Sequence, residues 1–550
     1  MDASRQSSYS NTSYTSESSK NRYDRWHWTV FLQAYFVSIA AILGIGILGL
    51  PVTLSHSGMQ PLILNLIISF FAQSILVLCF TTLLQQASAI KIHEANQFED
   101  FVCIEDDSTP LTSETNNTEA LAIIEHKLAE LKDLMVQDKD QDETQDDEIS
   151  LHTISKLFLP FGAYQLFDIL VIATFLSILI SFALAGGQAY SEITELPLPV
   201  MISIFVWSWA AVIIFLRKIV QPFVSVLTIV KCIALVVTDI DIVDQQVSVT
   251  FYVGLKIDLP IHNNWSYVGS SFLMTTVSLG GIILIMPMLF ARIRFNTREV
   301  VLFNTAIISA LGTVVILNLL WSYAVLGVVP QRCVDIQPTI MQPDNQNTTL
   351  AGHCNISLAW AERNGKISTV PLTEILRQHY PKYDWIASLV EIFIVISITV
   401  SFLTLGSALR HTLCGTLDTI WNYFKARMSE EAAAQVEDGV RTTTEKNWLW
   451  ITKILVYILT FGIAFIVAMF NPKAFIAILS SVGSFFINLQ AGLFIPMMIY
   501  KARRHASSNL KTPCPMGKIL YILHFLMAFY FLFAVVYDIV IVIIQSVHKS

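Results

Sequence analysis

Residues 43–51 read LGIGILGLP, which puts three glycines and a proline inside the first long apolar run of the chain. Glycine is conformationally loose and proline has no backbone N–H, so both weaken a continuous helix. Irregular backbone at membrane depth is tolerated only where it is buried in protein or lines a cavity. The stretch therefore predicts an interrupted first helix whose freed peptide groups face a ligand.

The composition around this stretch is that of a membrane protein. Of 550 residues, 54% are hydrophobic and 14% are charged, and the mean hydropathy is +0.58. Apolar runs of about 20 residues are long enough to cross a bilayer. We predict an all-α membrane protein with eleven spans in a transmembrane domain over 31–545; the spans are 31–52, 61–84, 158–185, 198–216, 221–239, 266–290, 301–328, 385–408, 448–470, 474–499 and 518–545.

The basic residues orient these spans. With a cytoplasmic N-terminus, 24 Lys and Arg residues fall in inside segments, counting Lys518 at the edge of the last span, and 8 fall in outside segments; the other two, Lys231 and Lys453, lie within spans. Cytoplasmic loops of membrane proteins carry the excess of Lys and Arg. We therefore expect a cytoplasmic N-terminus and an extracytoplasmic C-terminus, in the plasma membrane or an endolysosomal membrane.

Two cytoplasmic segments differ in composition from the spans. Residues 1–30 are polar and predict a disordered tail, and 85–157 predict an acidic loop. Within that loop, 94–150 hold 18 of the 42 acids and 3 of the 34 bases. Apolar residues recur at helical spacing over 121–135, which predicts a short amphipathic helix. The loop is either a solvated insertion or a docking site for a cytosolic regulator.

The loop 329–384 falls on the predicted outer side. It contains Cys333 and Cys354, and the sequons that begin at Asn347 and Asn355. Cysteines and sequons together indicate an oxidising compartment. We predict a Cys333–Cys354 disulfide and two N-linked glycans.

The first ten spans divide into two sets of five, and an odd number makes the second set enter the membrane from the opposite side. Residues 272–282 of the sixth span read FLMTTVSLGGI, and Pro287 follows. Breaks in corresponding spans are the sequence signature of an inverted-repeat transporter site. The alternative is that these small residues only let helices pack closely.

Several motifs resemble those of known transporters. Residues 44–51, GIGILGLP, followed by Ser57-Gly58, resemble the first-span motif of the amino acid/auxin permease family. Residues 396–406, ISITVSFLTLG, look like the corresponding helix of the bacterial tryptophan/tyrosine permeases, and NPKAF at 471–475 with GLFIP at 492–496 resembles span ten of both groups. The resemblance implies the five-plus-five inverted repeat with broken helices 1 and 6 of the amino acid–polyamine–organocation superfamily, and secondary transport of amino acids. Span six lacks the aromatic and Cys-His pattern common in the first family, so its substrate-selecting side chains do not carry over.

An amino acid substrate needs donors for its carboxylate, acceptors for its ammonium group and space for its side chain. Half-helix N-termini and unwound carbonyls supply the first two. We predict carboxylate binding by the backbone of Gly44, Ile45 and Gly46, ammonium binding near Thr275, Thr276 and Ser278, and side-chain space at Gly280.

Two deep charges are candidates for ion coupling. Lys231 lies in the middle of span five, where a lysine costs roughly 2.5–3.5 kcal/mol on insertion scales. Lysine loses its proton readily when buried, and related proton-coupled transporters carry a span-five lysine that looks similarly positioned. Lys231 is either this coupling group or a structural group bound to carbonyls of span one. Asp168 in span three is either a relay partner or a residue facing a cytoplasmic vestibule.

A sodium site is the alternative form of coupling. Carbonyls at Ala40 and Leu43 with hydroxyls at Thr399 and Ser401 would supply the oxygens that Na⁺ requires. Ser and Thr in membrane helices more often bond to their own backbone. Because Lys231 is also present, the sequence favours protons over sodium.

We interpret the chain as a secondary active transporter of neutral amino acids, coupled to protons and working by alternating access. An amino-acid-binding sensor without net transport and a Na⁺-coupled transporter are the alternatives. No nucleotide loop, metal-ligand cluster or nucleophile–base pattern indicates an enzyme, and nothing indicates nucleic-acid binding. The expected partners are a small amino acid, the lipid bilayer and the coupling ion H⁺ or Na⁺, with no resident cofactor.

The outer loop gives the first prediction. Asn347→Gln and Asn355→Gln should each lower the apparent mass in a glycosidase-sensitive way on gel electrophoresis. Asn116→Gln should not, because its sequon lies in the cytoplasmic loop. A glycan on Asn116 would overturn the topology from the first span onward.

Overall fold

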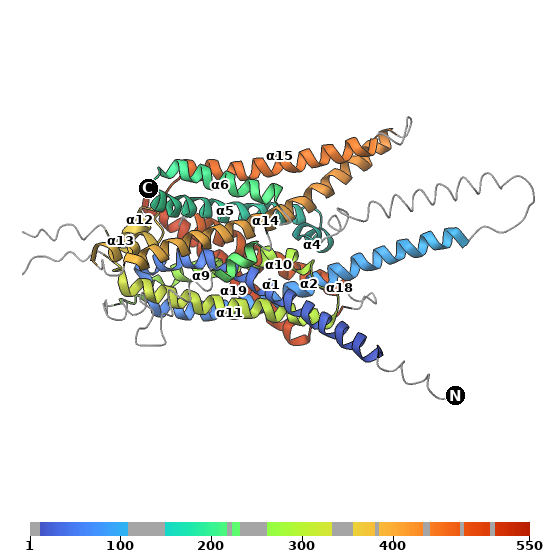
Figure 1. The fold of residues 1–550 in the computed structure, drawn as a ribbon, viewed down its shortest axis with the longest axis horizontal. Coiled ribbons are helices and arrows are strands. Elements are labelled where there is room, and N and C mark those ends of the chain that lie inside the picture. Colours follow the sequence, from blue (N-terminus) through green and yellow to red (C-terminus); the bar gives the residue numbers. More distant parts are fainter. Residues whose placement is uncertain are drawn as a thin grey trace, which may run out of the picture.

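The computed structural model describes residues 11–107, 149–216, 220, 223–230, 261–332, 356–379, 384–432, 441–473, 478–505 and 512–549. All regular elements within these ranges are helical, and none of the described residues forms a strand. The long helices lie side by side along one axis, and the beginning of α1 and the end of α19 lie at opposite ends of the bundle (Figure 1). This placement is the one that an odd number of crossings produces.

The helices are named in chain order with the labels of Figure 1. They are α1 (Asn11–Ser57), α2 (Met59–Asp107), α4 (Leu151–Phe158), α5 (Ala163–Thr194), α6 (Leu198–Phe215), the 3₁₀ turn η2 (Trp265–Tyr267), α9 (Val268–Gly280), α10 (Ile282–Phe290), α11 (Thr297–Val328), α12 (Leu358–Arg363), α13 (Thr369–His379), α14 (Asp384–Ala432), α15 (Arg441–Phe470), the π-helix η5 (Ile478–Gly483), α17 (Ser484–Leu489), the π-helix η6 (Gln490–Phe494), α18 (Ile495–His505) and α19 (Lys518–Lys549).

Ten helical segments among the described residues are long and apolar enough to cross a membrane. They correspond to ten of the eleven predicted spans. The predicted fifth span, 221–239, is described only as a helix over 223–230, and its remainder with Lys231 lies outside the described residues. The chain is an integral, multi-pass, all-α membrane protein, which confirms the predicted fold class.

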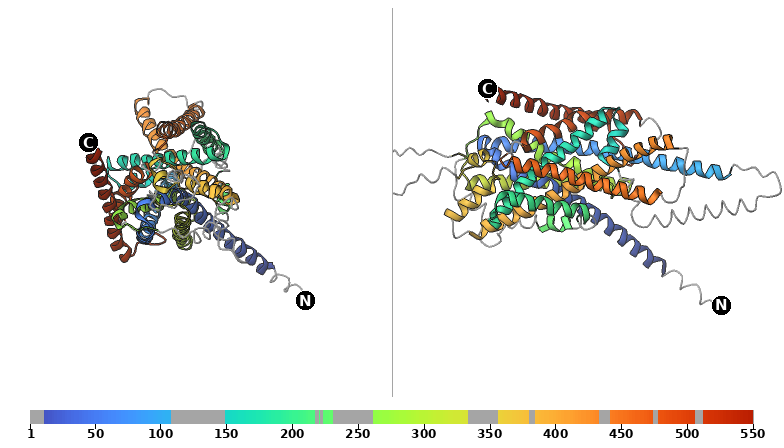
Figure 2. Two further views of the ribbon diagram at one scale, coloured as in Figure 1. Left: turned by 90° about the vertical axis from the view of Figure 1, so that its left-hand side faces the viewer. Right: turned by 90° about the horizontal axis from the view of Figure 1, so that it is seen from above.

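Helix α1 is the centre of the bundle. The whole of its most apolar part is buried, and it packs against α11, α9 and α14. The helices α15 and α19 lie at the periphery (Figure 2) and expose large apolar side chains such as Leu455 and Phe529. A surface this rich in large apolar side chains is typical of contact with lipid. The glycine stretch 43–51 is therefore buried along its whole length, inside the bundle.

Two predictions about the first helix are wrong. The predicted interruption at 43–51 does not occur, because α1 is helical from Asn11 to Ser57 with Pro51 inside it. The predicted disorder of 1–30 does not hold from Asn11 onward. Residues 11–30 contain neither glycine nor proline. Once a buried span has nucleated a helix, each added residue gains a hydrogen bond at little further cost, so the helix extends outward.

The predicted interruption of the sixth span is confirmed. Helix α9 ends at Gly280, α10 begins at Ile282, and Gly281 between them has a backbone ψ of −11°. Pro287 lies inside α10. The pairing of the two five-span sets as an inverted repeat stays a prediction, because residues 231–260, which would complete the first set, lie outside the described residues.

The two long loops are partly helical. Helix α2 continues to Asp107, so the predicted acidic loop 85–157 begins as an extension of the second span, and its predicted helix at 121–135 lies outside the described residues. In the loop 329–384, α12 and α13 cover the end of the bundle where α1 terminates (Figure 1). Cys333, Cys354, Asn347 and Asn355 lie outside the described residues, so the disulfide and the glycans stay predictions.

Gly58 makes the tight connection between α1 and α2, and it gives the second prediction. Its φ is +79°, and a Cβ added there would lie 2.5 Å from the His262 carbonyl oxygen. Gly162 has a similar φ of +90° but open space around it. A left-handed conformation costs an L-residue roughly 1–2 kcal/mol. Gly162→Ala should lower the free energy of unfolding by about this amount. Gly58→Ala should lower it further, because the added Cβ also collides with the His262 carbonyl oxygen.

The measurement is the midpoint of thermal unfolding of each purified variant, followed by a thiol-reactive dye that reports exposure of buried cysteines such as Cys79. Equal midpoints for the two variants would contradict the role of the His262 contact.

Candidate functional site

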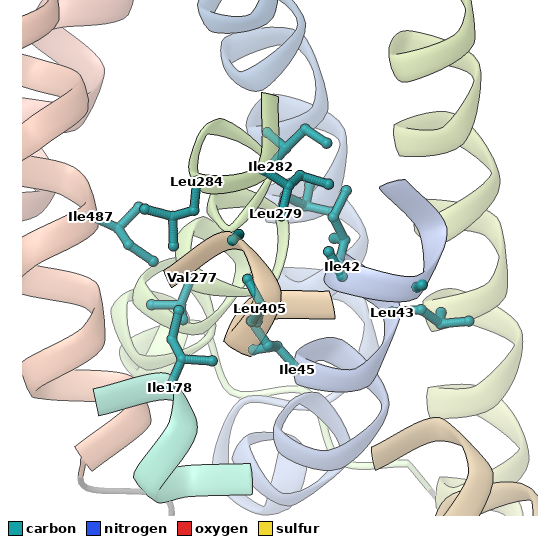
Figure 3. Close-up of a cluster of buried hydrophobic side chains, with 14 of the residues drawn as sticks. Ile42, Leu43, Ile45, Ile178, Val277, Leu279, Ile282, Leu284, Leu405 and Ile487 are labelled. Carbon is teal, nitrogen blue, oxygen red and sulfur yellow. The ribbon is translucent and has the colours of Figure 1, made fainter. Parts of the chain in front are cut away.

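The predicted residues of spans one and six meet at the centre of the bundle. A Cβ on Gly281 would lie 3.6 Å from Ile45 Cδ1, so α1 and the α9–α10 junction are in close contact. Figure 3 shows the side chains that fill this region. They are aliphatic residues from five parts of the chain: Ile42, Leu43 and Ile45, Ile178, Val277, Leu279, Ile282 and Leu284, Leu405, and Ile487. The two predicted backbone sites are thus neighbours, separated by packed apolar side chains.

The glycines of α1 are positions of close helix approach. A Cβ on Gly44 would collide with Ser401 on α14, one on Gly46 with the Asn318 amide on α11, and one on Gly49 with Met274 on α9. Each glycine therefore faces a different neighbouring helix. The packing interpretation accounts for all three in this structure, and binding by the backbone of Gly44, Ile45 and Gly46 stays a proposal.

Pro51 leaves a backbone carbonyl of α1 without its helical partner, and the Trp321 side chain replaces that partner. Its missing N–H leaves the Ile47 carbonyl, four residues earlier, without its helical donor. Trp321 Nε1 on α11 donates to that carbonyl oxygen at 3.0 Å, in a fully buried position. Since an unpaired buried carbonyl costs about 1–3 kcal/mol, this bond keeps α1 continuous.

Asn318 lies one helical turn before Ser322 on α11, beside Gly46. The Asn318 side chain is fully buried, and neither its amide nitrogen nor its amide oxygen has a hydrogen-bond partner among the described residues. The Ser322 hydroxyl is also buried without such a partner. Buried polar atoms in native proteins are nearly all paired, so each exception needs an explanation. An amide that offers both a donor and an acceptor can bind a zwitterionic ligand.

The hydroxyls of the sixth span are already bonded. Thr275, Thr276 and Ser278 each donate to the carbonyl three residues earlier, at 2.8, 2.7 and 3.0 Å. The two threonine oxygens also accept, Thr275 from Ser69 at 3.1 Å and Thr276 from Asn488 at 3.0 Å. This back-bonding is the usual behaviour of such residues in helices. Gly280 faces Ile487, because a Cβ on it would lie 2.5 Å from Ile487 Cγ2.

Asp168 is buried and held by two partners from α4. His152 Nδ1 lies 2.6 Å from Asp168 Oδ2, and the Ser155 hydroxyl donates to Asp168 Oδ1 at 2.9 Å. The exposed fractions of His152 and Asp168 are 3% and 8%, so the vestibule alternative for Asp168 does not hold in this conformation. His152 Nε2 has no partner among the described residues. A buried histidine paired with a carboxylate of a span is a default candidate for proton handling.

Gln490 extends this cluster along α5. Its Nε2 donates to the Leu170 carbonyl at 3.1 Å and to the Thr174 hydroxyl at 2.6 Å. Gln490 begins the π-helix η6, and Asn488 precedes it between η6 and η5. π-Helical turns interrupt the regular bonding ladder and are frequent at functional sites.

The sodium candidates are only partly assembled. The Ser401 hydroxyl donates to the Ala40 carbonyl at 2.6 Å, so these two are neighbours, with Leu43 less than one turn further along α1. Thr399 instead bonds the Tyr190 hydroxyl at 3.0 Å. No cluster of three or more His, Cys, Asp or Glu side chains suited to a metal ion occurs in the described part of the chain.

Four buried polar residues of this region were not predicted from the sequence: His152, Asn318, Asn488 and Gln490. For the last three a signal existed, since an amide inside an apolar run is uncommon and carries the same implication as a charge. His152 precedes its span and becomes a partner of Asp168 only through the fold. Asn471-Pro472 and the motif at 492–496 had directed attention to span ten without identifying its polar residues.

Comparisons with known proteins stop at the level of the fold. No protein-family model matches the chain, and no curated protein matches it. The structure is similar to that of a manganese transporter of Eremococcus coleocola bound to an aromatic bis-isothiourea substituted compound, with a TM-score of 0.45, 10% identity, and coverage of 93% of this chain and 86% of that one. Two single-residue variants of that transporter have TM-scores of 0.42 and 0.43, each with 10% identity and coverage of 92% and 86%. Membership of the amino acid/auxin permease family therefore stays a prediction.

The bond at Pro51 gives the third prediction. Trp321→Phe removes the donor and should destabilise the protein by about 1–3 kcal/mol, because the Ile47 carbonyl becomes unpaired. In a Pro51→Ala background the same substitution should cost clearly less, since the alanine N–H can bond to the carbonyl. The midpoints of thermal unfolding of the four proteins in this cycle measure the coupling. Additive effects would show that Trp321 acts only through packing.

Proposed function

We propose that the chain is a secondary transporter of neutral amino acids, coupled to protons and working by alternating access. The observation that carries the proposal is the contact of two weakened segments, 43–51 of α1 and Gly280–Gly281 between α9 and α10, at the centre of a multi-span bundle. Breaks in neighbouring spans form many transporter binding sites; here the break between α9 and α10 lies against the glycine stretch of α1, which is helical in this conformation.

The substrate site needs polar groups that this interface supplies. Asn318 lies against Gly46 with both amide atoms unpaired among the described residues. An amide nitrogen suits the substrate carboxylate and an amide oxygen suits its ammonium group. The aliphatic side chains where α1 meets the α9–α10 junction (Figure 3) favour a substrate with a neutral side chain, because a charge buried among them would be unpaired.

Substrate entry requires α1 to open. In the continuous helix, the N–H groups of Gly44 and Gly46 lie inside the bonding ladder. The stretch is nevertheless the weakest part of α1: glycine costs roughly 1 kcal/mol relative to alanine in a helix, and the Ile47 carbonyl depends on a side chain of α11. We infer that the described conformation is the occluded, helical form, and that opening at 43–51 exposes backbone donors beside Asn318.

For proton coupling we propose Asp168 with His152. The pair is buried, its atoms are 2.6 Å apart, and both groups can exchange a proton. Gln490 connects the same region of α5 to the π-helical part of span ten. Lys231 remains the second candidate for this role.

The function is tested with purified protein in proteoliposomes. Uptake of a panel of labelled neutral amino acids should follow an imposed pH gradient and should persist when Na⁺ is replaced by choline. Binding without uptake would support the sensor. Uptake that requires Na⁺ would overturn proton coupling.

Asp168 gives the fourth prediction. Asp168→Asn preserves the size and most hydrogen bonds of the side chain but cannot release a proton. We expect accumulation driven by the pH gradient to fall to the level without a gradient, while exchange of labelled for unlabelled substrate persists.

Glu391→Gln is the matched control, because Glu391 is also a buried carboxylate, paired with Arg377 at 2.9 Å near the other end of the bundle. It should retain gradient-driven uptake if it folds. Normal accumulation by the Asp168→Asn variant would exclude Asp168 as the proton carrier and direct the test to Lys231→Ala.

A further inference from the structure

A cavity of about 510 Å³ lies between α2, α4 and α18 and beneath the turn that precedes α19. It is separate from the centre of the bundle, and none of the substrate or coupling candidates lines it. Its walls are mainly apolar, with Leu83 and Ile90 from α2, Phe158 from α4, Ile499 from α18 and Met516 from the turn. Cavities of roughly 300–1,000 Å³ with mostly apolar walls are typical of small-molecule sites.

The rim of this cavity is cationic. Arg503 and Lys518 line it, and both side chains are exposed. The Arg503 guanidinium lies over the Tyr521 ring, 3.8 Å from the centroid, which fixes its position at the mouth. No carboxylate among the described residues is paired with either cation. The rim therefore presents two positive charges at the opening of an apolar chamber.

The two cations also lie at the level of a membrane surface. The apolar span that contains α18 ends at Arg504, and the span of α19 begins at Lys518. Basic pockets between transmembrane helices on the cytoplasmic side are suited to anionic lipid headgroups. The excess of Lys and Arg in the sequence predicts that this end of the bundle is cytoplasmic.

A buried acceptor completes the site. Gln86 lines the cavity, and its side-chain oxygen is buried without a hydrogen-bond partner among the described residues. An acceptor of this kind suits a hydroxyl group, such as that of a glycerol headgroup. Apolar walls, a cationic mouth and an unpaired acceptor together match an amphipathic anion better than a small polar one.

We propose that this cavity binds an anionic phospholipid, with one acyl chain against the apolar walls and the phosphate between Arg503 and Lys518. The same chemistry occurs in a free lysophospholipid and in a phospholipid of the bilayer. The inference does not depend on the proposed transport activity, because it concerns different residues and is tested by binding alone.

The fifth prediction is tested by native mass spectrometry of the full chain in nonionic detergent, with equal amounts of dioleoyl phosphatidylglycerol and dioleoyl phosphatidylcholine. We expect the protein to retain one phosphatidylglycerol preferentially. The double variant Arg503→Gln/Lys518→Gln should bind it about 30-fold more weakly, since each basic residue near a membrane surface contributes about 1 kcal/mol. Both side chains are exposed, so the variant is expected to fold.

Arg504→Gln is the matched control: it removes the same charge one residue away, and Arg504 does not line the cavity. The Arg504→Gln variant should bind phosphatidylglycerol as tightly as the unaltered protein does. Ala89→Phe should block the acyl chain, because Ala89 is a wall residue. Equal retention by the double variant and by Arg504→Gln would overturn the proposal.

Competition identifies the source of the headgroup. Oleoyl lysophosphatidylglycerol should displace the bound lipid, whereas glycerol phosphate should not. Displacement by glycerol phosphate at the same concentration would show an anion site without an acyl chain, and would overturn the proposed use of the apolar walls. Displacement by lysophosphatidylglycerol that is lost in Ala89→Phe would support it.

Discussion

The hydrogen bond from Trp321 to the Ile47 carbonyl allows the central helix of the bundle to contain a proline. Water is not available at the centre of a membrane bundle, so every backbone group there must find a partner within the protein. The indole provides that partner from α11, and α1 is helical through the three glycines that bring α14, α11 and α9 close to it. Loss of the bond would leave the Ile47 carbonyl unpaired, at a cost of about 1–3 kcal/mol, in the part of α1 on which these three helices pack.

The two glycine motifs show what sequence can and cannot decide. Gly280–Gly281 and Gly44–Gly46 have similar local chemistry, and an interrupted helix is predicted at both. The prediction is confirmed for the sixth span and wrong for the first. The difference lies in the neighbours: Asn318, Ser401 and the Trp321 bond surround α1 and stabilise its helical form. Helix propensity describes how unfavourable glycine and proline are in a helix, but tertiary contacts decide whether the helix forms in the folded protein.

The number and limits of most spans followed from hydropathy, because a bilayer imposes a minimum length on each crossing. Asp168 could also be found, since a carboxylate in an apolar run is conspicuous. Its partner could not be found. His152 lies outside the span, and the two meet only because the chain reverses between α4 and α5, where Gly162 adopts a φ of +90°. The same holds for Asn488 and Gln490, whose partners on α9 and α5 are more than 200 residues away in the sequence.

Helix α4 connects the buried His152–Asp168 pair to the cavity beside α18. It has only eight residues, and a helix this short is not stable on its own. Contacts with α5, α14, α18 and α2 therefore determine its position. One face of α4 places His152 next to Asp168, and the end of α4 places Phe158 in the cavity wall.

An acyl chain that fills the cavity would stabilise α4 in this position and, with it, the pairing of His152 and Asp168. Conversely, proton movement that separates the pair would release α4 and loosen the cavity. By linkage the two effects are equal in free energy. Bound lipid would raise the free energy needed to separate His152 from Asp168, and separation of the pair would weaken lipid binding by the same amount.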